Sequence, residues 1–141
     1  MAIISTLEDI VGSGNVTDKD FDLIGYSRTM TSYPPRSPDI VVLPETAEQV
    51  SEIMRLANRT RTPVTVRGGG TAGGTCIARG GGIIIDLSKM NKILEINEEM
   101  MTITVQGGCS VYKAFKELDK IGWELPLRPE FGPGPTMGAW I

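Results

Sequence analysis

The residues with the clearest chemical potential are the glycines of the stretch RGGGTAGGT, which occupies positions 67 to 75. We refer to residues 67–74 as the glycine loop. Glycine adopts backbone angles that other residues avoid, so a glycine-rich bend can turn successive amide N–H groups toward one anion. The loop therefore predicts either a phosphate site built from amides or a mobile surface hairpin, and the glycines alone do not separate the two.

Two common phosphate-binding patterns do not fit this loop. Gly68, Gly70 and Gly73 have the spacing GxGxxG, but a Rossmann fingerprint needs a helix to begin there. Only residues 74–82 separate Gly73 from the apolar run that starts at Ile83, which is too short for a crossover helix. No Lys-Ser or Lys-Thr pair follows the glycines, so a Walker-type loop is excluded as well. A phosphate-binding loop without a helix remains.

The chain contains no histidine, and this restricts the chemistry that its side chains can perform. Imidazole is the usual general base near neutral pH, so Ser-His-Asp and Cys-His sites cannot be built. The two cysteines, Cys76 and Cys109, lack the CxxC spacing of zinc sites. We therefore expect a bound cofactor to supply any chemistry.

The elements that position the loop follow from apolar periodicity. Residues 1–38 predict a helical arm, with Ser5 or Thr6 capping a helix through Ile10, followed by a proline-rich connector. Residues 39–141 predict one domain of α+β class with the order β-α-β-β-β-β-α. The expected strands are 39–44, 63–67, 82–87, 92–97 and 101–106, and the expected helices are 44–60 and 110–122.

Composition narrows the class of protein and its partners. A chain of 141 residues with 40% hydrophobic and 22% charged residues has the size of one globular domain. The net charge of −3 and the absence of a Lys/Arg cluster argue against a nucleic-acid partner. No run is apolar enough to predict a transmembrane segment. Few cysteines and a start without a signal-peptide pattern favour the cytoplasm.

Three stretches of the chain resemble the FAD-binding domain of the vanillyl-alcohol oxidase, or p-cresol methylhydroxylase (PCMH), superfamily. They read PDIVVLPETAEQVSEIMRLANRTRTPVTVRGGGTAGG, GIIIDLSKMNKILEINEEMMTITVQGGCSVYKAFKEL and GWELPLRPEFGPGPTMG. Within the superfamily they are most similar to the flavoprotein subunits of glycolate oxidase and D-lactate dehydrogenase. The likeness covers residues 39–138, with YSR at 26–28 as a weaker addition. It implies the N-terminal lobe of a PCMH-type FAD-binding domain, a small mixed sheet flanked by helices.

The resemblance also implies which residues bind the cofactor, because in that family the loop wraps the FAD pyrophosphate with its amides. The implied cofactor-binding residues are Arg67, Gly68, Gly69, Gly70, Thr71, Ala72, Gly73, Gly74, Pro126, Thr136, Met137 and Gly138. The turn at residues 106–108 approaches the cofactor in the family, although a simple turn before a helix explains its glycines equally well. We expect Asp86 and Ser88 to fix a turn rather than contact the flavin, and Cys109 to be a packing residue.

The activity implied by the resemblance is the oxidation of a 2-hydroxy acid such as glycolate or D-lactate, with FAD accepting the hydride equivalent. The link between flavin and histidine known in parts of the family is excluded here, so FAD binding is expected to be noncovalent. Relatives continue into a second lobe and a cap domain. The end of the chain at Ile141 therefore predicts a truncated protein or one piece of a split protein, which by itself holds FAD without turnover.

Two other functions stay open. A non-catalytic FAD- or nucleotide-binding module would work only with a partner subunit, and an exposed sheet edge would favour association with a second subunit or another copy. A purely structural domain would have lost ligand binding. The sequence hint for the latter is Ala139, which stands where the family has the second glycine of a Gly-Gly pair.

Overall fold

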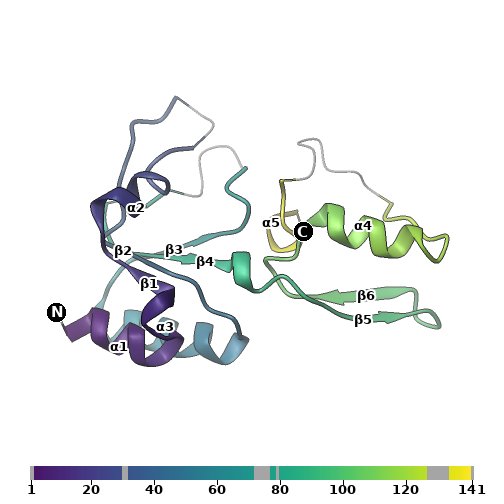
Figure 1. Ribbon diagram of the computed structural model, residues 1–141, viewed down its shortest axis with the longest axis horizontal. Helices are drawn as coiled ribbons and strands as arrows, with labels where there is room; N and C mark the ends of the chain where they lie inside the picture. The colour runs from purple at the N-terminus through teal and green to yellow at the C-terminus, as the bar shows by residue number, and fades with distance from the viewer. Residues whose placement is uncertain (1, 30–31, 72–76, 79, 127–133, 141) are drawn as a thin grey trace.

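The computed structural model describes residues 2–29, 32–71, 77–78, 80–126 and 134–140. Two lobes lie side by side, a four-stranded sheet covered by helices and a β-hairpin with two further helices (Figure 1). The elements are α1 (Ala2–Val11), η1 (Ser13–Asn15), β1 (Val16–Thr17), α2 (Asp20–Ile24), β2 (Ile40–Val42), α3 (Ala47–Thr60), β3 (Val64–Arg67), β4 (Ile83–Asp86), η2 (Leu87–Lys89), β5 (Ile93–Asn97), β6 (Thr102–Val105), α4 (Val111–Asp119) and α5 (Met137–Trp140).

The first lobe is built on a mixed sheet with the strand order β1-β2-β4-β3. Strands β2, β4 and β3 are parallel, and β1 pairs antiparallel with β2. The central strand β4 is buried along its whole length, as its unbroken run of isoleucines predicts for a parallel strand covered on both faces. This confirms the expected small mixed sheet flanked by helices.

Alternating side chains of β2 and β4 serve opposite faces of this sheet. Val41 and Ile84 pack against Leu23 of α2 on one face. The flanking residues of both strands, such as Val42 and Ile83, pack on the other face against α1 and α3. The sheet is therefore rigidly held between helices, which fixes the position where β3 ends and the glycine loop begins.

The N-terminal segment differs from the sequence expectation. Helix α1 begins at Ala2, so Ser5 and Thr6 lie inside the helix and the predicted caps are wrong. Leu7 and Val11 are buried in the same core as β2 and α3. Helices gain most of their stability from packing an apolar face, and this packing extends α1 beyond the position that local capping would choose.

The second lobe consists of the antiparallel pair β5–β6 and the helices α4 and α5. Ser110 caps α4 by accepting a hydrogen bond from the Lys113 amide over 3.4 Å. Cys109 is fully buried in the core of this lobe, as expected of a packing residue, and burial raises the pKa of its thiol. The hairpin turn at residues 98–101 is exposed and extends away from the first lobe (Figure 1).

The short helix η2 connects the two lobes. Asp86 Oδ1 accepts a hydrogen bond of 2.8 Å from the Ser88 amide, so Asp86 fixes this turn as predicted.

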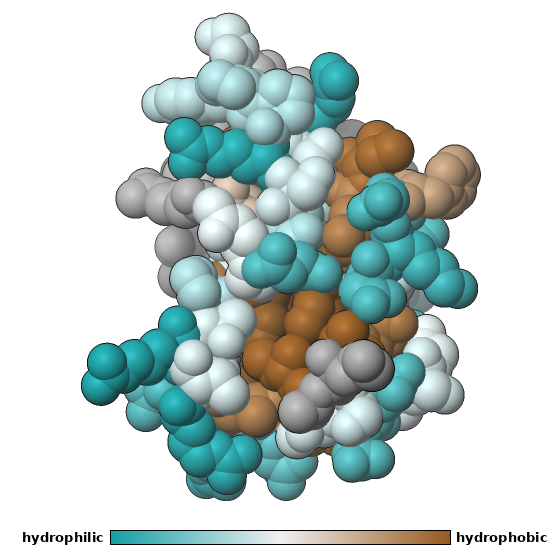
Figure 2. Space-filling view, turned by 90° about the vertical axis from the view of Figure 1, so that its left-hand side faces the viewer, coloured by the Kyte–Doolittle hydropathy of each residue, from teal (hydrophilic) through white to brown (hydrophobic). Residues whose placement is uncertain are grey.

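Seen from the first-lobe end, apolar side chains gather at the centre of the face and polar side chains surround them (Figure 2). In the part of the chain that the structure describes, no helix combines the length and apolar character needed to cross a bilayer.

Candidate functional site

The described residues of the glycine loop that follow β3 enter neither a helix nor a strand. Strand β3 ends at Arg67, and residues 68–71 have no regular secondary structure. Gly70 has a φ angle of 69°, in the left-handed region that glycine adopts readily. A positive φ angle is one feature of an amide nest. Residues 68–71 form no helix, whereas a Rossmann fingerprint places the start of a helix at its glycines.

The loop is held against a segment from the far end of the chain. A Cβ on Gly68 would collide with the Thr136 side chain, lying 3.2 Å from its Cβ. A Cβ on Gly69 would collide with the carbonyl oxygen of Gly134 and lie 3.0 Å from that carbonyl carbon. Neither position has room for a side chain. The close approach of the Thr136 side chain and the Gly134 backbone therefore explains the first two glycines of the loop.

The backbone amides of residues 68–71 are candidate donors to a ligand. Among the described residues, none accepts a hydrogen bond from the backbone N–H groups of residues 68–71. Backbone donors in a folded protein nearly always find a partner in protein, water or ligand. Four consecutive amides that donate to no described residue, in a bend that contains a positive φ angle, could serve as donors to an anion such as a diphosphate.

A third glycine contact brings the turn at residues 106–108 into the same region. A Cβ on Gly138 would lie 2.9 Å from the Gly107 carbonyl oxygen, which accepts a 2.9 Å hydrogen bond from the Gly138 amide. A Cβ on Gly108 would collide with the carbonyl oxygen of Leu87. The family resemblance placed this turn near the cofactor, and the structure places it beside two of the implied binding segments.

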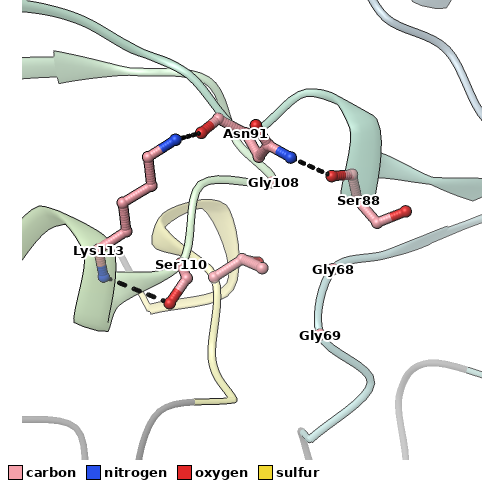
Figure 3. A pocket seen from close by; sticks show the side chains of 8 residues that line it. Gly68, Gly69, Ser88, Asn91, Gly108, Ser110 and Lys113 are labelled. Carbon is pink, nitrogen blue, oxygen red and sulfur yellow. Dashed lines mark hydrogen bonds between the residues drawn. The ribbon is translucent and has the colours of Figure 1, made fainter.

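Two open cavities border the contact between the glycine loop and residues 134–136. One has a volume of about 300 Å³ and the other about 250 Å³, and both are lined by Gly68, Gly69 and Thr136. The larger is closed on its other sides by Ser88, Asn91, Gly108, Ser110 and Lys113 (Figure 3). The smaller is lined by residues that include Gly70, Thr71, Gly107, Gly138 and Ala139.

The lining of the larger cavity is organised by local hydrogen bonds. Lys113 Nζ donates to the Asn91 carbonyl oxygen over 2.8 Å, and Asn91 Nδ2 donates to the Ser88 carbonyl oxygen over 2.9 Å (Figure 3). These bonds join α4 to the segment that follows β4. These bonds give the second-lobe wall of the cavity a defined shape. The ammonium group of Lys113 adds one positive charge to a lining that otherwise consists of glycines and small polar side chains.

Arg67 contributes a second positive charge beside the loop. Its Nη1 atom is buried and has no hydrogen-bond partner among the described residues. Nearby, the Tyr26 hydroxyl donates a 2.8 Å hydrogen bond to Asp86 Oδ2. Burial raises the pKa of Tyr26 to about 12, and the bond to Asp86 acts in the same direction. Tyr26 is therefore a neutral donor at physiological pH.

The structure brings together most, but not all, of the residues that the resemblance implied. Residues 68–71 line one cavity together with Thr136 and Gly138, whereas Arg67 lines neither cavity. Met137 packs in the second core, and Pro126 is exposed and lines neither cavity. Ala72, Gly73 and Gly74 lie outside the described residues. Sequence reasoning missed the wall residues Asn91, Ser110 and Lys113, because no local pattern marks their convergence.

Ala139 lines the smaller cavity and is exposed. Its methyl group stands at the position where relatives were expected to have a second glycine. Position 138 of the pair must stay glycine, because an added Cβ there would lie 2.9 Å from the Gly107 carbonyl oxygen. Within the described ranges, no cluster of three or more potential metal ligands occurs.

Comparison of the sequence with protein families and with known proteins gives matches along nearly the whole chain. A family profile described as FAD binding domain matches residues 38–141. The glycolate oxidase subunit GlcD of Bacillus subtilis (strain 168) is 32% identical over 137 residues, which cover 96% of this chain and 29% of the relative. The mitochondrial D-lactate dehydrogenase (cytochrome) of Arabidopsis thaliana is 31% identical over 140 residues, covering 97% of this chain and 24% of the relative.

The solved structures show the same fold. The structure of p-cresol methylhydroxylase with bound substrate superposes with a TM-score of 0.76 at 24% sequence identity, covering 85% of this chain and 24% of that chain. The expected PCMH-type lobe is therefore confirmed. The present chain spans less than a third of each of these three proteins.

Proposed function

The chain belongs to the family of FAD binding domains, and we therefore propose that its glycine loop holds the diphosphate of FAD, without a covalent link to the flavin. The observation that carries this proposal is the set of amides at residues 68–71 that donate to no described residue. A diphosphate supplies the acceptor oxygens that these donors lack. The close contact of Gly68 and Gly69 with residues 134–136 supports the proposal, because it holds the bend in place before a ligand arrives.

The residues around the loop fit the charge of such a ligand. The Arg67 guanidinium makes no ion pair within 4.0 Å in the described part of the chain, and Lys113 adds a positive charge on the opposite lobe. Charge-assisted hydrogen bonds to phosphate are about twice as strong as neutral ones. We propose Arg67, residues 68–74, Thr136 and Gly138 as the cofactor-binding set, with Thr71 Oγ1 as an additional donor.

We further propose that the domain serves an oxidoreductase that acts on a 2-hydroxy acid such as glycolate or D-lactate. The names of the two relatives support this substrate class. Bound FAD would supply the acceptor for the hydride equivalent that leaves the substrate carbon. The residues of this chain bind and orient the cofactor. Since the chain spans less than a third of the length of these relatives, we expect no turnover from these 141 residues alone.

A second candidate is a non-catalytic FAD- or nucleotide-binding module that works with a partner subunit or in a homo-oligomer. One observation favours it: Val66 of the edge strand β3 is 55% exposed and lines the smaller cavity, so an apolar wall of the site is left uncovered. A cytoplasmic location is part of both proposals and rests on the low cysteine content.

Titration of the purified chain with FAD tests the proposal. We expect quenching of flavin fluorescence with a saturable dissociation constant, and a melting temperature that rises with FAD concentration. FMN, which lacks the diphosphate, is the matched control ligand and should bind more weakly. Equal binding of FMN and FAD would contradict the assignment of the loop to the diphosphate. Assays with glycolate or D-lactate and an artificial electron acceptor then separate an enzyme from a binding module.

A further inference from the structure

The guanidinium of Arg67 contacts both an aromatic ring and the backbone of the glycine loop. Its Cζ atom lies 5.0 Å from the centroid of the Tyr26 ring, within the range of a cation–π interaction. A Cβ on Gly70 would lie 2.6 Å from Arg67 Nη2, so the guanidinium also touches the loop at the position of its positive φ angle. Arg67 thus connects the loop physically to Tyr26.

The Tyr26 ring is itself held in place by a buried acid at the end of β4. The Tyr26 hydroxyl donates to Asp86 Oδ2, while Asp86 Oδ1 accepts from the Ser88 amide. Asp86 is 7% exposed, and both of its carboxylate oxygens are therefore occupied. A tyrosine fixed at its hydroxyl has little freedom to rotate away from the cation that it faces.

Part of the Arg67 guanidinium is buried without a counter-charge among the described residues. Its buried Nη1 lacks a partner, and no carboxylate lies within 4.0 Å of the guanidinium among the described residues. A buried cation that lacks a counter-charge is costly, so its position needs support from neighbouring groups. The face of an aromatic ring provides such support without neutralising the charge.

We propose that Tyr26 is a positioning residue that holds the Arg67 guanidinium against the glycine loop and so raises the affinity of the loop for the cofactor diphosphate. This inference rests on the proposed function. It extends the cofactor site to the segment around α2, which lies outside the region matched by the family profile. Tyr26 acts through Arg67 and has no direct contact with the ligand in this proposal.

The test uses the full chain with three substitutions and a matched control. Tyr26→Leu removes the ring and the hydroxyl, whereas Tyr26→Phe keeps the ring and removes only the bond to Asp86. Tyr33→Leu makes the same chemical change at a tyrosine that is 65% exposed. Arg67→Met removes the charge. We expect the FAD dissociation constant to rise about tenfold for Tyr26→Leu, about threefold for Tyr26→Phe, and not at all for the control.

A double-mutant cycle separates positioning from general stability. In the Arg67→Met background, Tyr26→Leu should change the FAD dissociation constant by less than about twofold, because the ring then has no cation to hold. A readout without FAD is the side-chain Nε–H resonance of Arg67 in NMR spectra. The Tyr26 ring should shift this resonance by its ring current, and the shift should disappear in Tyr26→Leu but persist in Tyr26→Phe and Tyr33→Leu.

The outcomes distinguish this inference from the proposed function. If the wild-type chain binds no FAD, the proposed function fails and the inference falls with it. If the wild type binds FAD but Tyr26→Leu weakens binding equally in both backgrounds, only the positioning role is overturned. An Arg67 resonance that is the same in wild type and Tyr26→Leu would also overturn it, whatever the variants do to FAD binding.

Discussion

Substitution of Gly69 by alanine probes the backbone contact on which the site depends. The added Cβ would collide with the Gly134 carbonyl oxygen and lie 3.0 Å from its carbon. The φ angle of Gly69 is not in the left-handed region, so the obstacle is steric and not conformational. Because the obstacle is backbone, the loop or residues 134–136 must shift. Overpacking of this kind costs about 1–3 kcal/mol.

FAD binding should weaken as well, because the amides of the shifted loop would no longer point toward one ligand. A loss of about 1–3 kcal/mol corresponds to a dissociation constant for FAD raised about 5- to 150-fold. Fluorescence titration with FAD measures this change, and thermal unfolding measures the accompanying loss of stability. Gly14→Ala is the matched control, since a Cβ there would meet no atom within 4 Å. It should leave both quantities unchanged.

The neighbouring substitution Gly68→Ala sharpens the test. Its Cβ would collide with the Thr136 side chain, so adding Thr136→Ala should recover part of the lost stability. The same addition should not rescue Gly69→Ala, whose obstacle is a carbonyl group. Wild-type FAD affinity and melting temperature in Gly69→Ala would refute the role of the backbone contact, and so would an equal rescue of both variants by Thr136→Ala.

Three further predictions concern stability and reactivity. The pKa of Tyr26 is about 12 in the folded chain against an ordinary value of 10.0, so the unfolded chain loses this proton first and stability should fall between about pH 10 and 12. Tyr26→Phe should remove that part of the fall in urea unfolding curves. In a Cys76→Ser variant, the buried Cys109 thiol should react with Ellman's reagent only after unfolding; reaction in the folded state would contradict its burial. Ile53→Ala should lower the free energy of unfolding by about 2–5 kcal/mol, whereas Met54→Ala, at a position 46% exposed, should change it by less than about 0.5 kcal/mol.

Local signals in the sequence predict much of the fold. The run of isoleucines at 83–85 marks a strand that is buried on both faces, and the structure has β4 there. The helix expected at 44–60 is present as α3, although it begins only at Ala47, after Thr46 accepts a hydrogen bond from the Gln49 amide over 3.3 Å. Such features depend on neighbours within one turn or one strand, which is why a sequence without any alignment reveals them.

Features that depend on distant residues were not predictable in the same way. Strand β1 is two residues long and exists because it pairs with Val41 and Val42 of β2. The sequence indicates that the glycine loop lacks side chains, but not that Gly69 meets Gly134. The contact of Arg67 with Tyr26 has no local signature either. The sequence therefore identifies the glycine loop, but only the structure shows which distant residues lie beside it and complete the candidate site.

The exposed turn of the β5–β6 hairpin is a suitable position for inserting a reporter into this domain. The turn is closed by the pairing of Asn97 with Thr102, and Met100 and Met101 at its tip are 71% and 80% exposed. Lengthening an exposed loop adds little closure entropy, because that entropy grows only with the logarithm of loop length. A fluorescent reporter or affinity peptide spliced in at this tip would therefore extend into solvent, leaving the glycine contacts that shape the cofactor site untouched.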